Sequence, residues 1–281
     1  MKIRKNILPR TLTDIGCCLL LSLGIPVTFI FEITVLLPEF HDYGSPLYIM
    51  TLVAGIFLVF NIKTNMLTCM FTDTSIRHEV LDPPADTDEL EGWRFCSTCE
   101  SYAPPRSWHC VVCKTCILKR DHHCMFTGCC IGHRNHRYFM MLLIYLFIGT
   151  TYTTAYNSVY IWWFRYNDFV NFTTILKLIC PMLMFTLDTS AINLFLLIYM
   201  LNVIGFLQSL VLLVYHWKII SHGAVVYERK APKYNLGWKR NLEMVFGKRW
   251  YLVWLSPFVS SELPNDGIHW EQVLKESDKM K

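Results

Sequence analysis

Residues 96–130 read CSTCESYAPPRSWHCVVCKTCILKRDHHCMFTGCC, and this stretch decides how the whole chain is interpreted. Pairs of cysteines with two residues between them recur in it, and histidines stand among them. A Cys-x2-Cys turn directs two thiolates at one tetrahedral ion, so the stretch predicts structural zinc sites. The segment around it, residues 63–137, is polar and lacks the apolar residues of a core. Metal binding can replace that core, because each structural zinc supplies on the order of 10 kcal/mol of folding free energy.

The stretch offers more ligands than two zinc ions need. Two closed tetrahedral sites use eight donors, whereas ten cysteine and histidine side chains are present, with Cys129 as an eleventh. Asp121, His122 and Cys124 supply a carboxylate, an imidazole and a thiol within four residues. A histidine can lower the pKa of a neighbouring thiol, and a carboxylate can hold the imidazole in one tautomer. We therefore interpret these three residues as a nucleophile, its base and its orienting group.

Outside this stretch the chain is strongly apolar. Of its 281 residues 53% are hydrophobic and only 17% are charged, and the mean hydropathy is +0.31. These values are typical of a membrane protein rather than a soluble domain. Four apolar runs are long enough, or nearly so, for helices that cross about 30 Å of hydrocarbon. They are residues 15–37, 46–62, 138–164 and 192–217.

Three details of these runs lead to specific expectations. The second run is short, but it can extend through residues 65–71. Residues 178–187 contain Pro181 and are too few to span alone, so they predict an interfacial or re-entrant segment, with a fifth crossing as the alternative. Glu32 lies near the end of the first run, where its carboxylate is expected to snorkel to the interface.

The basic residues are divided very unevenly among the connecting segments. Four precede the first run, nine lie between the second and third, and eleven follow the fourth, which places 24 of 26 on one side. The positive-inside rule therefore predicts that both termini and the cysteine-rich segment are cytosolic. Cytosolic thiols are kept reduced, which favours zinc over a set of disulfides. The net charge of +4 is too small to indicate a nucleic-acid partner.

Residues 96–139 resemble the cysteine-rich domain of the DHHC-type protein S-acyltransferases, the palmitoyltransferases. The resemblance rests on the string Asp121-His122-His123-Cys124, and it includes Pro105-Arg106, Asn135 and Phe139. Two weaker similarities follow the fourth run. Val225-Val226-Tyr227-Glu228 stands where the family has Thr-Thr-x-Glu, and residues 234–247 resemble the family's aromatic-asparagine-glycine motif.

The resemblance implies an α-helical polytopic membrane protein with four transmembrane helices and a cytosolic zinc-binding cysteine-rich domain between helices 2 and 3. The helices would enclose a cavity for an acyl chain. The expected location is the ER or the Golgi. The expected parts are residues 1–71 with the cytosolic N-terminus and helices 1 and 2, the zinc domain at 72–137, helices 3 and 4 with a luminal loop at 138–217, and a cytosolic C-terminal region at 218–281.

The resemblance also implies roles for individual residues. One zinc ion would be held by Cys96, Cys99, His109 and Cys116, and the other by Cys110, Cys113, His123 and Cys130. Cys124 would be the nucleophile, His122 its base and Asp121 the partner of that base. In the implied ping-pong reaction acyl-CoA, such as palmitoyl-CoA, acylates Cys124. The acyl group then passes to a membrane-proximal cysteine of a protein substrate at the cytosolic face.

The coenzyme A part of the substrate, an anion, would approach from the cytosol past basic side chains, and the acyl chain would enter from the membrane lipid bilayer. The expected basic rim consists of Lys119, Arg120, Arg134 and Arg137.

The chain departs from the family pattern at three places. Met125-Phe126 replaces Pro-Trp, Cys129 replaces an asparagine, and Val225-Val226 lacks the two threonine hydroxyls. The alternative to an active enzyme is a catalytically weak, zinc-containing membrane scaffold or adaptor. That alternative would need the same metal ligands, but it would not need Asp121 and His122 beside a spare thiol.

Overall fold

The computed structural model describes residues 2–79, 81–85, 92–186 and 190–279. Its internal contacts divide the chain into two units. The cysteine-rich unit comprises Met1–Ser22, Lys63–Leu142 and Val214–Lys281. The helical unit comprises Leu23–Ile62 and Leu143–Leu213.

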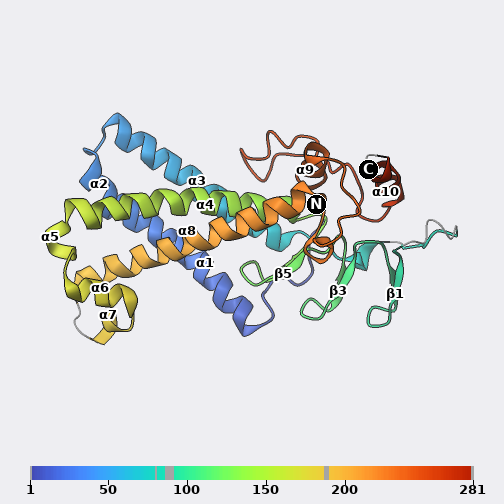
Figure 1. The fold of residues 1–281 in the computed structure, drawn as a ribbon, viewed down its shortest axis with the longest axis horizontal. Coiled ribbons are helices and arrows are strands. Elements are labelled where there is room, and N and C mark those ends of the chain that lie inside the picture. Colours follow the sequence, from blue (N-terminus) through green and yellow to red (C-terminus); the bar gives the residue numbers. More distant parts are fainter. Residues whose placement is uncertain (1, 80, 86–91, 187–189, 280–281) are drawn as a thin grey trace. The chain divides into compact units, whose positions relative to one another are not determined.

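Four helices among the described residues are long and apolar enough to cross a membrane, at 29, 26, 29 and 31 residues (Figure 1). The first is α1 (Leu12–Phe31), continued by a π-helical turn (Glu32–Leu36) and α2 (Leu37–Phe40). The others are α3 (Pro46–Phe71), α4 (His136–Val159) with a π-helical turn (Tyr160–Phe164), and α8 (Ala191–Ser221). The prediction of four spans is confirmed. The second helix does continue to Phe71, which gives its short apolar run the length to span.

The first span begins at a capping box. The Thr11 hydroxyl accepts a hydrogen bond from the Asp14 amide at 3.0 Å, and the Asp14 carboxylate accepts one from the Thr11 amide at 3.4 Å. Two otherwise unpaired amides at the helix start are satisfied in this way. The cap also fixes the position of the buried Asp14 carboxylate, which takes part in the site described below.

Glu32 does not snorkel, so that prediction is wrong. Its side chain is buried in the helical unit, at 7% exposure, and it accepts a hydrogen bond from the Asn157 side chain on α4. A buried carboxyl group needs such a partner because burial removes its water. The π-helical turn that begins at Glu32 lies at the same place in the helix.

The connection between α4 and α8 is built of short helices. They are α5 (Tyr166–Phe169), α6 (Phe172–Ile179) and α7 (Leu183–Thr186). Phe169 and Met184 belong to a buried cluster with Tyr160 and Leu196, so the connection packs onto the helical unit. Residues 178–186 of the expected interfacial segment lie in α6, α7 and the turn between them, and Leu187 lies outside the described residues. Helices of eight and four residues are too short to cross a membrane.

Three small antiparallel hairpins form the cysteine-rich stretch (Figure 1). They pair β1 (Arg94–Cys96) with β2 (Ser101–Ala103), β3 (Trp108–Cys110) with β4 (Thr115–Ile117), and β5 (His122–Cys124) with β6 (Cys129–Ile131). Strands of three residues are too short to be stable alone. The register brings His109 opposite Cys116 and His123 opposite Cys130, so each of the last two hairpins presents a histidine and a cysteine side by side.

The hairpins repeat along the chain at an interval of 14 residues. Cys96, Cys110 and Cys124 each end the first strand of a hairpin. Four residues later each turn has a residue with positive φ, which tightens the turn. These residues are Glu100 (50°), Lys114 (52°) and Gly128 (57°). The residue just before each of them is Cys99, Cys113 or Thr127.

The C-terminal region contributes a 3-10 turn (Val226–Glu228), α9 (Trp238–Phe246) and α10 (Glu271–Asp278) to the cysteine-rich unit. Asn241 joins its parts, because its side chain accepts from the Leu236 amide at 2.9 Å and donates to the Ser221 carbonyl at 2.8 Å. Gly223 has a φ of +67°, and a Cβ there would lie 2.4 Å from a backbone oxygen. The chain can therefore turn after α8 only with glycine at this position.

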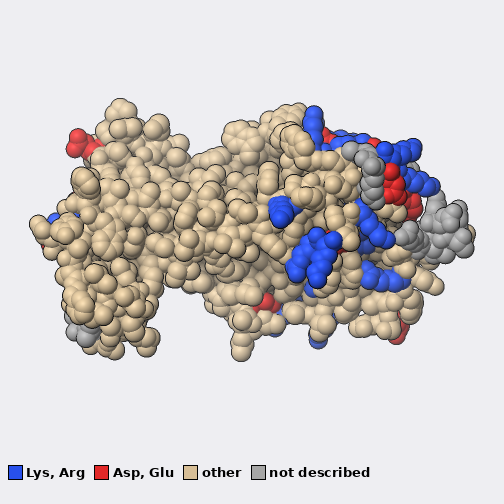
Figure 2. Space-filling model, in the orientation of Figure 1, with Lys and Arg blue, Asp and Glu red and all other residues tan. Residues whose placement is uncertain are grey.

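The two units differ sharply in charge. Lys and Arg side chains gather on the surface of the cysteine-rich unit, whereas the helical unit shows an almost uncharged surface in the same view (Figure 2). Arg165 and Lys177 are the basic residues of the helical unit. Such a division suits one unit in hydrocarbon and one in water.

Candidate active site and metal centres

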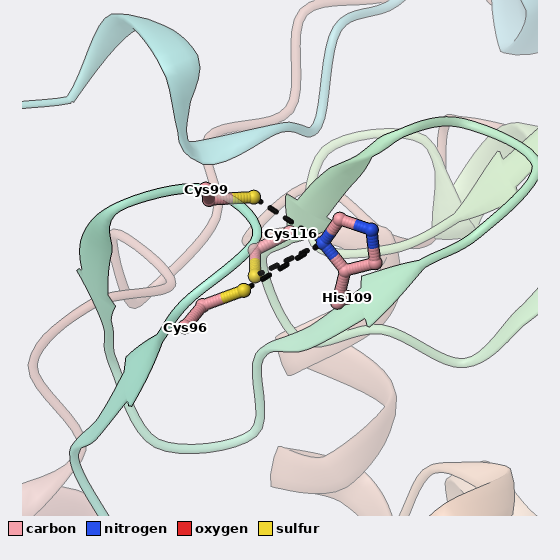
Figure 3. Close-up of side chains that lie close together, drawn as sticks. All are labelled: Cys96, Cys99, His109 and Cys116. Atoms are coloured by element: carbon pink, nitrogen blue, oxygen red, sulfur yellow. Dashed lines mark hydrogen bonds between the residues drawn. The ribbon is translucent and has the colours of Figure 1, made fainter.

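The first cluster of possible metal ligands joins the first two hairpins. Cys96 and Cys99 come from the turn of the first hairpin, and His109 and Cys116 come from the second, on β3 and β4 (Figure 3). The His109 Nδ1 atom lies 3.7, 3.2 and 4.0 Å from the sulfurs of Cys96, Cys99 and Cys116. A tetrahedral zinc site places nitrogen and sulfur ligands about 3.6 Å apart, so the donors fit such an ion.

The second cluster has the same form one hairpin further on. It consists of Cys110, Cys113, His123 and Cys130. His123 Nδ1 lies 3.7, 3.4 and 3.7 Å from the three sulfurs, and the Cys113 and Cys130 sulfurs are 3.7 Å apart. Two sulfurs on one zinc ion would lie about 3.8 Å apart. The outer nitrogen of His123 lies 3.3 Å from the Asp14 carboxylate, which would fix the ring orientation as second-sphere partners of metal ligands do.

Each cluster could hold one metal ion, and each unites the four residues that the resemblance groups together. All twelve cysteines lie among the described residues, and none of them forms a disulfide. Cys129 belongs to neither cluster. Its thiol lies 3.7 Å from the Cys69 carbonyl and 3.4 Å from the Thr127 hydroxyl.

Asp121, His122 and Cys124 meet at the third hairpin. Asp121 is fully buried, and its Oδ2 atom accepts a hydrogen bond from His122 Nδ1 at 2.7 Å. Its Oδ1 atom accepts from the Val226 amide at 2.9 Å, so both oxygens have a donor. This arrangement leaves the Nε2 atom of His122 available to a thiol or to a reacting group. His122 and Cys124, two residues apart on β5, have side chains on the same face of the strand.

The charge balance favours an ionised pair at this site. Burial raises the pKa of Asp121, but the hydrogen bond from His122 and the nearby histidine charges together outweigh it and hold that pKa below its usual value. Burial opposes a charge on His122, but the hydrogen bond to Asp121 and then the contact with Cys124 raise its pKa to about 9. An imidazolium beside a thiol stabilises the thiolate, which is the nucleophilic form.

Sequence reasoning missed a fourth member of this site. His216, near the end of α8, is 4% exposed, and its Nδ1 atom lies 3.4 Å from Asp121 Oδ2. Its ring centre is 5.0 Å from those of His122 and Phe139. The available indication was a histidine inside an otherwise apolar run, since polar residues in membrane helices usually have a function. The rings of His216 and Phe139 both pack against the His122 ring.

The segment Val225-Val226-Tyr227-Glu228 supports the site without the family's threonines. The backbone of Val226 supplies the amide that binds Asp121. Glu228 accepts two hydrogen bonds from Arg106, at 2.7 and 3.0 Å. The Arg106 guanidinium also lies 4.4 Å from the Tyr234 ring and 4.5 Å from the Trp270 ring. Buried bidentate pairs of this kind hold two segments in a fixed register. The two segments here are the cysteine-rich stretch, residues 96–130, and the chain after α8.

The Met125-Phe126 departure is also compensated. The Cys18 thiol on α1 lies 3.3 Å from the Phe126 carbonyl and 3.5 Å from the Met125 carbonyl. These weak hydrogen bonds tie the residues after Cys124 to α1. Met125 keeps 45% of its surface exposed, so an apolar side chain is available beside Cys124.

The four basic side chains expected to form an exposed rim for coenzyme A do not form one, so this prediction is wrong. Lys119 is 2% exposed and donates to the Met244 carbonyl at 3.1 Å, and Arg120 is 9% exposed and bonds the Tyr227 hydroxyl. Burial, together with the charge of nearby Arg106, lowers the pKa of Lys119 to about 7. Arg134 pairs with Glu79, and Arg137 donates to the Ser261 carbonyl. These four side chains bind other parts of the cysteine-rich unit.

Comparisons with known proteins agree with this site. A family model described as DHHC palmitoyltransferase matches residues 89–233. A probable palmitoyltransferase ZDHHC24 from Danio rerio is 34% identical over 78% of this chain and 75% of that protein. Proteins of the same name from Rattus norvegicus and Homo sapiens are 32% and 31% identical, over 74% and 75% of this chain and 73% and 75% of theirs. The chain therefore belongs to the DHHC palmitoyltransferase family and is a protein S-acyltransferase.

Proposed function

We propose that the chain moves a long-chain acyl group from acyl-CoA, such as palmitoyl-CoA, through a thioester on Cys124 to cysteine thiols of protein substrates. The observation that carries this proposal is the Asp121–His122 hydrogen bond next to Cys124 on one short strand. It puts an oriented base beside a thiol that lies outside both metal clusters. Family membership does not favour the alternative of a weakly active scaffold.

In the first half of the reaction the Cys124 sulfur attacks the carbonyl carbon of the acyl-CoA thioester. The Cys124 thiol passes its proton to His122 before the attack, which gives the protonated His122 described above. The bond between the acyl carbon and the coenzyme A sulfur then breaks, and coenzyme A leaves as a thiolate that takes this proton from His122. Cys124 is left as an acyl thioester, and His122 is neutral.

In the second half the attacking group is a cysteine thiol of the protein substrate. His122 accepts the proton of that thiol, which attacks the carbonyl carbon of the Cys124 thioester. Cys124 leaves as a thiolate beside the protonated His122, which returns the site to its first state. Asp121 keeps Nδ1 of His122 protonated throughout, so that Nε2 handles every proton. The Val226 amide holds the Asp121 carboxylate in place through a hydrogen bond, and the His216 ring lies beside that carboxylate.

We expect His122→Ala to lower the rate of Cys124 acylation by roughly 10²- to 10⁴-fold, the usual contribution of a positioned base. Asp121→Asn should fall between the wild type and His122→Ala, since the carboxylate acts only through the imidazole. Single-turnover labelling with acyl-CoA measures both rates. Metal content is the control, because neither residue belongs to either of the two clusters of three cysteines and one histidine. A His122→Ala variant that is acylated at the wild-type rate would exclude the histidine as the base.

Two structural Zn²⁺ ions, one in each cluster, are part of the proposal. Three thiolates and one imidazole in a tetrahedral arrangement form the donor set that zinc prefers. Zinc would supply folding free energy and fix the hairpins, and no acyl-transfer step would take place on it. The ligands would be Cys96, Cys99, His109 and Cys116 for one ion and Cys110, Cys113, His123 and Cys130 for the other.

The proposed orientation places both termini and the zinc domain in the cytosol, with protein substrates at the cytosolic face of the ER or the Golgi. It is supported by the 24 of 26 basic residues on that side of the four spans. The proposed parts are 1–71, 72–137, 138–217 and 218–281. The acyl chain of acyl-CoA would enter from the membrane lipid bilayer, and no nucleic-acid partner is proposed.

A protease test decides the orientation. A tag at the C-terminus of the protein in intact microsomes should be removed by added protease, because the C-terminal region is proposed to face the outside of these vesicles. A lumenal marker protein that stays intact controls for sealed membranes. A tag that survives until detergent is added would reverse the proposed orientation.

A further inference from the structure

A pocket of the cysteine-rich unit borders the second metal cluster but takes no part in the proposed reaction. It lies between the N-terminal segment, residues 2–11, and residues 72–77, which follow α3. Four basic side chains line it. They are Arg4, Lys5, Arg10 and Arg77. The unit as a whole carries the gathering of Lys and Arg seen in Figure 2.

The backbone around the pocket is held by a short antiparallel pairing. Ile3 pairs with Thr72, the Arg4 amide donates to the Phe71 carbonyl at 2.8 Å, and the Asp73 amide donates to the Lys2 carbonyl at 2.8 Å. Pro9 packs on Gly128, where an added Cβ would meet its ring at 3.0 Å. The N-terminal segment is thus attached both to the end of α3 and to the third hairpin. The pocket walls are ordered backbone with defined hydrogen bonds.

Two buried donors in the lining lack acceptors. The Arg4 Nε atom and the Ser75 hydroxyl are both buried and have no hydrogen-bond partner among the described residues. Ser75 is only 5% exposed, so bulk water does not satisfy its hydroxyl. Buried polar groups without partners are uncommon and indicate a missing ligand, ion or water. Since both groups can donate, the missing species is an acceptor.

The charges of the pocket lining also indicate that the missing ligand is an anion. Among the described residues, the lining contains four basic side chains but only one acid, the buried Asp73. Its Oδ1 atom accepts a hydrogen bond from the Ser75 amide at 2.8 Å. Arg10 donates to the Cys113 carbonyl at 2.7 Å, and Arg77 donates to the Lys114 carbonyl at 2.9 Å. Each guanidinium has five donors, so several remain for a ligand. Guanidinium groups match the geometry of phosphate oxygens.

The position of the pocket indicates where such an anion would come from. α1 begins at Leu12, directly after the N-terminal wall, and α3 ends at Phe71, directly before the other wall. Both are candidate membrane spans. The ends of spanning helices lie at the depth of the phospholipid headgroups. Basic side chains at that depth attract anionic lipids.

We infer that this pocket binds a phosphate monoester, carried by an anionic lipid headgroup or by a soluble compound. The four basic side chains balance its charge, and Arg4 Nε and the Ser75 hydroxyl donate to its oxygens. The inference does not depend on the role of Cys124, so a failure of the proposed chemistry would leave it standing. Arg4 also donates to the Gly128 carbonyl at 3.3 Å, which connects the pocket to the turn of the hairpin that carries Cys124.

The test uses the full-length protein in phosphatidylcholine nanodiscs, with inositol trisphosphate and inorganic phosphate as probes. Binding is measured directly with labelled probe and through the rise in Tm that any ligand of the native state causes. One pocket variant is Lys5→Gln with Arg77→Gln, both exposed side chains. Its matched control is Lys239→Gln with Arg249→Gln, which removes the same two charges from exposed positions outside the pocket.

We expect the pocket variant to bind inositol trisphosphate about tenfold more weakly or worse, and the control variant to bind as the wild type does. Ser75→Ala changes no charge and removes a hydroxyl without a partner, so the variant should fold normally. It should still lower the affinity for the probe about tenfold. Unchanged metal content in every variant excludes damage to the second cluster. The inference is overturned if the wild type binds neither probe. It is also overturned if the control variant loses as much affinity as the pocket variant, or if Ser75→Ala binds normally.

A second lipid composition separates the two sources of phosphate. In nanodiscs that contain a phosphatidylinositol monophosphate, a lipid ligand would raise the Tm of the wild type and leave no further rise for the soluble probe. Ser75→Ala should lose that lipid-dependent rise. If these nanodiscs behave as pure phosphatidylcholine does while the soluble probe still binds, the natural ligand is a soluble phosphate.

Discussion

Replacing Cys124 by serine is expected to abolish the hydroxylamine-labile acyl adduct that forms when the purified protein is incubated with labelled palmitoyl-CoA. The variant should fold normally and keep two metal ions per chain, because Cys124 belongs to neither metal cluster. A serine hydroxyl beside the imidazole is a far weaker nucleophile than a thiolate, so the loss should approach the detection limit. Labelling, hydroxylamine treatment and elemental analysis of the same preparation provide the measurement.

The contrast with Cys130→Ser makes this result specific. Cys130 is six residues further on, in the second cluster, and its replacement should cost metal as well as acylation. Cys124→Ser that still acquires a thioester at the wild-type level would remove Cys124 from the mechanism. Cys129, whose thiol lies on the opposite strand of the same hairpin, would then be the nucleophile to test.

The second large effect is expected at a metal ligand. Cys113→Ser should leave the second cluster with three donors and unfold the hairpins, because structural zinc can contribute on the order of 10 kcal/mol to folding. The purified variant should contain less than two metal ions per chain, be cleaved readily by protease in residues 92–137, and show no acylation. Elemental analysis and limited proteolysis measure the first two effects directly.

Cys129→Ser is the matched control for this prediction. Cys129 is as deeply buried as Cys130, at 2% exposure, but it belongs to neither cluster. It should therefore keep two metal ions and wild-type resistance to protease. A Cys113→Ser protein with two metal ions and normal resistance would show that the second cluster is not a zinc site.

The sequence was sufficient for the features that depend on composition and local chemistry. The four spans follow from apolar runs, and even the extension of α3 through Phe71 follows from the length that a bilayer requires. The three hairpins could not be located from periodicity, because strands of three residues are shorter than any period that a pattern can show. Ligand spacing, and not side-chain alternation, determines where they lie.

The errors have a different physical origin. The basic rim was expected because Lys119 and Arg120 are charged, but the chain after α8 covers them and uses them as hydrogen-bond donors. His216 was missed because its partner, Asp121, is 95 residues earlier in the chain, and a single sequence does not show such a contact. Glu32 was misplaced for the same reason, since its partner Asn157 is on another helix. The contacts that could not be predicted from the sequence are those between buried polar groups far apart in the chain.

The 14-residue repeat explains why the third hairpin has a thiol to spare. Each metal cluster takes two cysteines from the turn of one hairpin and a histidine and a cysteine from the next hairpin. Cys124 and Thr127 occupy in the third hairpin the positions of these two turn cysteines. Among the described residues no fourth hairpin follows, since α4 begins at His136. In the proposed mechanism the nucleophile Cys124 is thus an unused ligand position at the end of the series. It stays available because no further hairpin among the described residues supplies a histidine and a cysteine for a third site.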